Sequence, residues 1–195
     1  MITDPLTDEE KKILLKLARQ SIELAVGGHP LPHLVLEDYP PNLKEHGASF
    51  VTLTEDGDLR GCIGALEPYQ PLVQDVCEHA AAAALDDFRF SPVTPYEVSR
   101  LVIEISRLTV PQPLQYEHPQ DLPNCLKAGS DGVILRDGIR RATFLPQVWE
   151  KLPDPVEFLS HLCQKMGAPA DLWKRKLLQV FIYQVEEFQE GKLKT

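Results

Sequence analysis

The sequence predicts an α+β fold in which helices flank a largely antiparallel sheet. Apolar residues recur at helical spacing in residues 7–27, 71–85 and 155–167. Alternating apolar residues surround two Asp-Gly pairs, Asp56-Gly57 and Asp137-Gly138, and such pairs are the strongest short-range signal for a β-hairpin. Because hairpins join neighbouring strands in antiparallel fashion, helices combined with hairpins indicate the α+β class.

The first predicted helix begins with a capping box. Thr7 is the expected N-cap, and Glu10 is the residue expected to reach back to it. Gly27-Gly28 ends the helix, since glycine readily adopts the backbone conformation that closes a helix. Residues 28–47 contain four prolines, which predicts a long ordered loop.

The first hairpin has two plausible registers. A two-residue turn would place Cys62 opposite Val51, on a face of mixed polarity. A three-residue loop with Gly57 left-handed would instead pair Thr52 with Arg60. The second register separates apolar from polar side chains more cleanly, so we favour it, and it places Cys62 away from the main core. The expected strands are residues 49–54 and 58–65.

The second predicted helix starts at Pro71 and places Cys77 on its buried face. It ends in Asp86-Asp87, which is unfavourable because helix C-termini attract cations rather than anions. Such a local violation is usually offset by a partner or explained by a function. Arg89 is the nearest candidate for a salt bridge.

The remaining elements follow from the same patterns. Residues 101–107 alternate as a strand with Leu101, Ile103 and Ile105 inward, so that Glu104 and Ser106 project from the opposite face. Residues 108–130 predict a proline-rich connection. The elements expected after it are a hairpin at 133–144, a short helix at 146–151, a longer helix after Asp154-Pro155 with Val156, Leu159, Leu162, Cys163 and Met166 inward, and a strand at 177–185.

Composition limits the function classes. The chain has 195 residues, 43% of them hydrophobic and 25% charged, which suits one soluble globular domain, alone or with a small lobe. A formal charge of −9 would repel a phosphate backbone, so we expect no nucleic-acid partner. No run approaches the ~18 apolar residues of a membrane span, and Met1–Pro5 lacks the features of a signal peptide. We therefore expect a cytoplasmic protein without a membrane partner.

The four cysteines show no Cys-x-x-Cys spacing, and the histidines form no metal-binding pattern. We therefore expect reduced thiols and no metal site. The stretch Leu59 to Gly64, Leu-Arg-Gly-Cys-Ile-Gly, is the most informative part of the chain. Two glycines inside a strand indicate a bulge or a close approach to the backbone.

Two interpretations of Cys62 remain open. Arg60 would lie on the same face, ~7 Å along the strand, and a nearby guanidinium lowers the pKa of a thiol. Cys62 is therefore a candidate nucleophile or ligand-contacting thiol. The alternative is a small side chain that fills a tight position. No histidine stands where the sequence would suggest a partnering base.

The same stretch, together with four others, resembles the AMMECR domain family, named after the Alport, midface hypoplasia and elliptocytosis chromosomal region. The other matching segments are 87–92 (Asp-Phe-Arg-Phe-Ser-Pro), 104–106, 129–135 and 143–148. The resemblance implies that residues 1–195 form a single AMMECR-type domain with two subdomains, a larger α+β part and a smaller lobe with a cleft between them. It also implies a pathway shared with Memo-like and radical S-adenosylmethionine proteins, while the reaction stays undefined.

Two hypotheses follow. The first is a cleft protein that binds or processes a small molecule, with Cys62 as the catalytic residue. Its expected ligand-binding residues are Arg60, Gly61, Gly64, Arg89 and Glu104. The second is a non-catalytic adaptor, suggested by the long proline-rich loops at 28–47 and 108–130. The chain carries no cofactor motif, and in particular no Cys-x3-Cys-x2-Cys cluster, so we expect no cofactor in either case.

Overall fold

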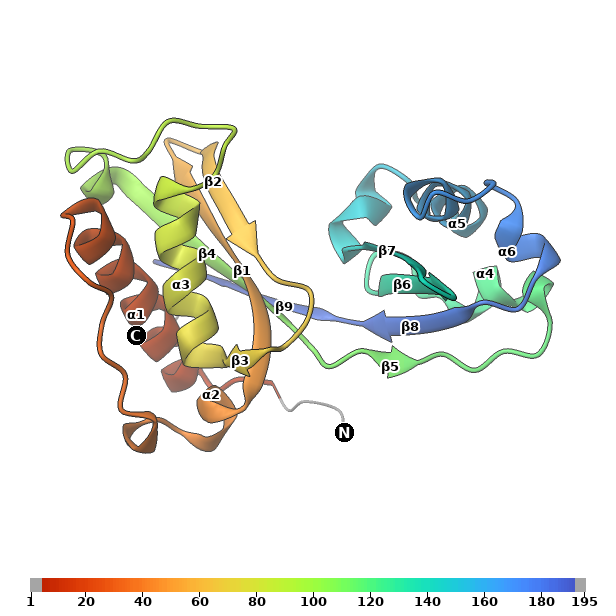
Figure 1. Ribbon diagram of the computed structural model, residues 1–195, viewed down its shortest axis with the longest axis horizontal. Helices are drawn as coiled ribbons and strands as arrows, with labels where there is room; N and C mark the ends of the chain where they lie inside the picture. The colour runs from red at the N-terminus through yellow and green to blue at the C-terminus, as the bar shows by residue number, and fades with distance from the viewer. Residues whose placement is uncertain (1–4, 192–195) are drawn as a thin grey trace. The chain divides into compact units, whose positions relative to one another are not determined.

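The structure is a computed structural model that describes residues 5–191, so residues 1–4, part of the segment interpreted as lacking an export signal, lie outside it. The chain forms two compact units. Unit 1 contains the described residues up to Thr109 and from Glu186 onward, and unit 2 is Val110–Val185. Within each unit, helices pack against an antiparallel sheet (Figure 1). The predicted α+β class is confirmed.

Unit 1 is built from two long helices and a five-stranded sheet. Helix α1 (Asp8–Val26) starts with the predicted capping box: the Glu10 N–H donates to Thr7 Oγ1, and the Thr7 N–H donates to Glu10 Oε2. The long loop that follows contains a 3-10 turn at Leu36–Asp38 and the short helix α2 (Pro41–Lys44). Helix α3 (Leu72–Leu85) is the second long helix, and Cys77 is buried on it as predicted.

The sheet of unit 1 has the strand order β2-β1-β4-β9, with β3 paired to β1 beside this path. Helix α3 contacts β1 and β2, and α1 contacts α3 and β4, so the helices cover one face of the sheet (Figure 1). The core lies between this face and the helices. The strands are β1 (His46–Glu55), β2 (Asp58–Gly64), β3 (Gln70–Pro71), β4 (Leu101–Leu108) and β9 (Val185–Gln189).

The favoured register of the first hairpin is wrong. Strands β1 and β2 are joined by the two-residue turn Asp56-Gly57, whose residues both have positive φ angles, 54° and 93°. Thr54 pairs with Leu59, but the register then shifts, and Cys62 pairs with Thr52 rather than with Val51. The shift leaves Arg60 as the extra residue of a β-bulge. The glycine pattern had indicated a bulge, but its position depends on contacts outside the hairpin.

Unit 2 is a four-stranded sheet of order β5-β8-β6-β7 with helices packed on it. Phe158 of α5 stacks on Trp149 with 3.7 Å between ring centroids and an interplanar angle of 7°, which anchors the core of this unit. The strands are β5 (Gln112–Pro113), β6 (Gly132–Asp137), β7 (Arg140–Phe144) and β8 (Gln179–Tyr183), and the helices are α4 (Leu122–Cys125), α5 (Pro155–Lys165) and α6 (Leu172–Arg175). Further 3-10 turns lie at Val98–Arg100, Pro119–Asp121 and Pro146–Glu150.

Two other expectations need correction. The apolar run predicted as one strand at 177–185 is divided at Gln184 into β8 of unit 2 and β9, which joins the sheet of unit 1. Val156 is exposed rather than inward, because it lies in the first turn of α5, where Asp154 caps the helix. The buried face of α5 begins at Phe158.

Candidate functional site

Cys62 lies in a row of polar side chains that crosses three strands of unit 1. It pairs with Thr52 of β1, and Thr52 pairs with Glu104 of β4. Paired residues of neighbouring strands project from the same face of a sheet, so thiol, hydroxyl and carboxylate lie side by side. All three residues are half-buried. The Thr52 hydroxyl donates to Cys62 Sγ across 3.3 Å.

This row lies on the face opposite the helices, and Gly61 shows why. A Cβ atom on Gly61 would come closer than 3.0 Å to the carbonyl oxygen of Ala83 in α3, so the α-carbon of Gly61 faces the helix directly. Side chains alternate along a strand, and the Cys62 side chain therefore points away from α3. The sequence predicted this side of the sheet for Cys62, although through a different register.

The backbone of Cys62 is held from the outer edge of the sheet. The Cys62 N–H donates to Asp87 Oδ2 (2.8 Å), and Arg89 Nη2 lies 3.4 Å from the Cys62 carbonyl oxygen. Arg89 also donates to both carboxylate oxygens of Asp87, at 2.9 and 2.6 Å. Because β2 is an edge strand, the Asp87–Arg89 pair occupies the position that a further strand would take.

The predicted salt bridge between Asp87 and Arg89 is therefore confirmed. Hydrogen bonds from the Arg89 side chain, with the Cys62 and Arg89 N–H groups, hold the pKa of Asp87 far below its usual value, against the effect of burial. From the sequence, Asp87 was notable only as an acidic residue at the C-terminal end of a helix, where a negative charge is unfavourable. Its bond to Cys62, 25 positions away, was not predictable from that signal.

Arg60, the bulge residue, is bound by Glu97. Arg60 Nε donates to Glu97 Oε1 (2.8 Å), and the other carboxylate oxygen accepts from the N–H and hydroxyl of Thr94, both at 2.7 Å. The hydrogen bond from Arg60 is the main reason that the pKa of Glu97 is lowered to about 2. The chain between α3 and β4 is thus fastened to β2 at two points, through Asp87 and through Glu97.

The predicted site residues therefore divide into groups with different contacts. Cys62 and Glu104 share the open face of the sheet. Arg60 and Arg89 engage carboxylates beside β2, and Arg89 rather than Arg60 lies against the backbone of Cys62. Gly61 packs closely against α3, and its contact with a ligand stays a prediction. A Cβ atom on Gly64 would meet the backbone of Ser49 and the side chain of Phe50.

A buried polar cluster on the helical side of the sheet was not predicted from the sequence. Ser49 Oγ donates to Asp75 Oδ2 (2.6 Å), and His79 Nδ1 lies 3.1 Å from the same oxygen. The i,i+4 spacing of Asp75 and His79 on α3 was the available signal. Since Cys62 projects from the opposite face, His79 is not a base for its thiol. The cluster fixes the start of α3 against β1.

Across residues 5–191, no group of three or more His, Cys, Asp or Glu side chains is arranged to hold a metal ion. All four cysteines are free thiols, with Cys77 and Cys163 buried and Cys62 and Cys125 partly exposed. No helix in the described part of the chain is long and apolar enough to cross a membrane.

Together, the fold and the order of its elements define an α+β protein with a fixed edge strand and a half-buried thiol. The profile of the AMMECR1 family matches residues 15–188, and the chain belongs to this family. A relative from Methanothermobacter thermautotrophicus is 39% identical over 187 residues, covering 95% of this chain and 97% of the relative.

A second relative, the protein MJ0810 of Methanocaldococcus jannaschii, is 38% identical over 192 residues, with 95% and 92% of the two chains covered. Among solved structures, the uncharacterized protein PH0010 from Pyrococcus horikoshii superimposes with a TM-score of 0.80 at 36% identity. That match covers 96% of this chain and 95% of the other. These comparisons support the fold and the family, and none of these three relatives is named for a reaction.

Proposed function

We propose that the protein binds or processes a small molecule on the open face of the unit 1 sheet, centred on Cys62. The observation that supports this most directly is the way Cys62 is held. Asp87 and Arg89 fix its backbone from outside the sheet, while its side chain stays half-buried on the face that α1 and α3 leave uncovered. A side chain on a rigid strand is positioned more accurately than one on a loop.

The expected roles follow from the contacts. Cys62 and Glu104 are the groups that a ligand on this face would meet, with Thr52 between them donating to the thiol. Arg60 and Arg89 position the strand through their carboxylate partners. Gly61 and Gly64 allow β2 to pack closely against α3 and β1.

The family resemblance supports a wider setting for this proposal, a pathway shared with Memo-like and radical S-adenosylmethionine proteins. From the composition, charge and motifs of the chain we further propose a cytoplasmic protein that binds neither nucleic acid nor a cofactor of its own. Cys62 is a half-buried thiol for which the sequence suggests no partnering base, so any redox or radical chemistry would belong to the partners.

The test has two stages. First, a limiting amount of iodoacetamide should modify Cys62 before Cys77 and Cys163 in the native protein. Those two thiols are buried, and burial raises the pKa of each, so less of the reactive thiolate forms. Mass spectrometry of the peptides ranks the three. A Cys62 as protected as the other two would leave it a packing role only.

Second, activity should appear only when the pure protein is combined with a Memo-like protein and a radical S-adenosylmethionine enzyme, or with their product. Cys62→Ser should abolish that activity, and Cys163→Ser, a change at a buried thiol of unit 2, should preserve it. Turnover without partners, or a stoichiometric cofactor in the pure protein, would contradict the proposal. Full activity of the Arg60→Ala, Cys62→Ser double variant would remove the function from residues 59–64.

An adaptor is the second candidate, and one observation favours it. Phe88 and Tyr96 are 95% and 89% exposed, although the segment that carries them is fastened to β2 through Asp87 and Glu97. Rigidly presented aromatic side chains are typical anchors of protein interfaces. An adaptor should retain a protein partner after Cys62→Ser and lose it after Phe88→Ala. If the protein instead acts at the small-molecule site, its activity should be lost after Cys62→Ser and retained after Phe88→Ala.

A further inference from the structure

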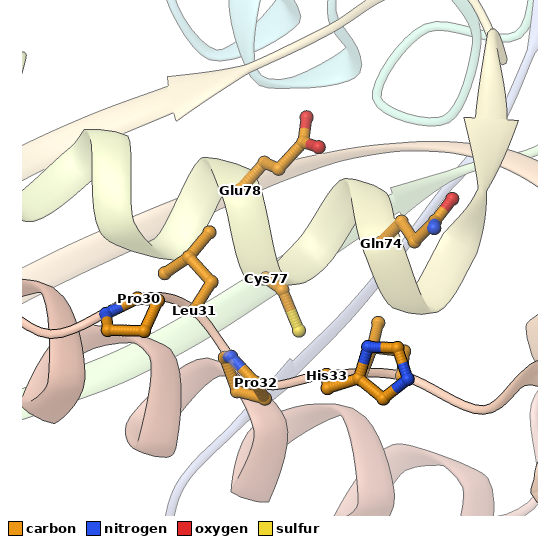
Figure 2. Close-up of a pocket in the computed structure, with 8 residues that line it drawn as sticks. Pro30, Leu31, Pro32, His33, Gln74, Cys77 and Glu78 are labelled. Carbon is orange, nitrogen blue, oxygen red and sulfur yellow. The ribbon is translucent and has the colours of Figure 1, made fainter.

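Unit 1 contains a concave site on the helical side of its sheet, separate from the Cys62 face. It is a cavity of about 530 Å³ between the loop after α1 and helix α3 (Figure 2). Residues 30–34 form one wall, and Gln74, Cys77 and Glu78 form the other. This volume falls within the ~300–1,000 Å³ typical of small-molecule pockets.

The loop wall is both apolar and rigid. Pro30 and Pro32 bracket Leu31, and proline fixes its own φ angle and restricts the residue before it. The loop is also held where it leaves α1, since the His29 N–H donates to the carbonyl of Leu24 (2.8 Å). Less conformational freedom is lost when a ligand binds a wall that is already ordered.

Cys77 forms an uncharged floor. Figure 2 shows its sulfur pointing from α3 toward the loop. The residue is only 3% exposed, and burial, with a smaller effect from the charge of Glu78, raises the pKa of the thiol. A neutral thiol suits an apolar ligand body and is a poor nucleophile. We therefore assign Cys77 to contact rather than to chemistry.

Polar groups stand at one end of the cavity. His33 of the loop and Gln74 of α3 lie at the same end in Figure 2, and neither side chain has a hydrogen-bond partner among residues 5–191. Glu78, by contrast, accepts from Gln70 Nε2 (2.9 Å), and its carboxylate points away from the loop. The hydrogen-bonding groups available to a ligand are thus an imidazole and an amide.

We propose that this cavity is a binding site for a small neutral molecule with an apolar body and an amide head. The body lies against Leu31, the two prolines and Cys77. The head hydrogen-bonds to Gln74, which both donates and accepts, and to His33. A carboxylate head fits less well because Glu78 borders the same cavity, and like charges repel.

The test uses N-acetyl-L-leucine methylamide as the probe and Cys77 as the reporter. In the native protein, the small neutral reagent methyl methanethiosulfonate should modify Cys77 faster than Cys163, because Cys77 borders this cavity. Cys163 is an internal control, since it is also a buried thiol with a raised pKa. The probe should slow modification of Cys77 in a saturable way and leave Cys163 unchanged.

Variants of the protein test which side chains bind the amide head of the probe. Gln74→Leu should weaken protection by the probe up to about tenfold, the effect of losing a hydrogen bond. Gln164→Leu, at an exposed position of α5 in unit 2, is the matched control and should not change it. His33→Leu provides an independent variant on a loop, where a substitution leaves the helix intact. N-acetyl-L-leucine, with the same body and an anionic head, should protect less than the amide.

Several outcomes would overturn the proposal. Cys77 and Cys163 reacting equally slowly would mean that the cavity does not admit small molecules. Protection of both cysteines by the probe would indicate general stabilisation. If the probe protects Cys77 equally in Gln74→Leu, His33→Leu and the parent, neither side chain binds the amide head. If N-acetyl-L-leucine protects Cys77 more strongly than the amide, the site does not prefer a neutral head. None of these outcomes depends on the Cys62 site, so the two proposals fail separately.

Discussion

Replacing Gly61 with alanine tests the contact between β2 and α3 with a single methyl group. The new Cβ atom would lie closer than 3.0 Å to the carbonyl oxygen of Ala83 and 3.1 Å from its carbonyl carbon. Both are backbone atoms of a helix, so no flexible side chain can move aside. Helix and strand must separate by on the order of 1 Å, which loosens the surrounding core.

We expect the free energy of unfolding to fall by about 2–3 kcal/mol, at the upper part of the range for overpacking. For a chain of this length, that corresponds to a melting temperature lower by about 5–10 °C. Differential scanning calorimetry measures both quantities. Gly61→Val should be at least as destabilising, because it adds two further methyl groups at the same contact.

Gly57→Ala is the matched control. Gly57 has a φ angle of +93°, and a Cβ atom there would meet nothing within 4 Å. Its cost is therefore only that of a left-handed backbone, about 1–2 kcal/mol. If Gly61→Ala melts within a degree of the parent, or no lower than Gly57→Ala, the close approach of α3 does not explain the glycine, and the assignment of the open face loses its main support.

Two further predictions concern the edge of β2 and the core of unit 2. Asp87→Asn should lower the free energy of unfolding by about 2–4 kcal/mol near neutral pH, since it weakens charged hydrogen bonds at a buried position. Because folding lowers the pKa of Asp87 from 3.8, the carboxylate stabilises the protein above that pH, and the stabilisation disappears as the pH falls through the folded-state pKa. Urea denaturation at about pH 7 and about pH 3 should show the difference between parent and variant shrinking, and a constant difference would contradict the role of the charge. Phe158→Ala should cost about 3–5 kcal/mol through the cavity it leaves and the loss of stacking on Trp149, whereas Phe158→Leu, which fills part of that cavity, should cost less, and a Phe158→Leu variant as stable as the parent would rule out a specific contribution from the ring.

The sequence predicted the local elements better than their partners. The capping box at Thr7, the burial of Cys77 and the two Asp-Gly hairpins all depend on residues within a few positions of one another. The predicted hairpin register was wrong because two contacts outside the hairpin determine the position of the bulge. Glu97, which lies 37 positions away in the sequence, binds Arg60. Helix α3 comes so close to Gly61 that no side chain fits between them.

The prediction of a single strand at 177–185 was wrong for a similar reason. An apolar run predicts burial in a strand but does not say in which sheet. Here the run divides at Gln184, so that β8 pairs with β6 in unit 2 while β9 lies beside β4 in unit 1. Both strands are partly buried, and nothing in their composition marks the change of sheet. Only the pairing partners distinguish them.

The acid at the end of α3 and the glycine in β2 are best understood as one arrangement. Because Gly61 lets α3 approach the strand closely, the residues that follow the helix emerge beside the outer edge of β2, where Asp87 reaches the N–H of Cys62. Two segments that carry the family resemblance, 59–64 and 87–92, are thereby joined through the Cys62 backbone. Loss of activity on replacing Arg60, Gly61 or Asp87 would report a displaced strand as readily as a lost contact. Only a change confined to the Cys62 side chain, such as Cys62→Ser, separates the chemistry of the thiol from the structure that holds it.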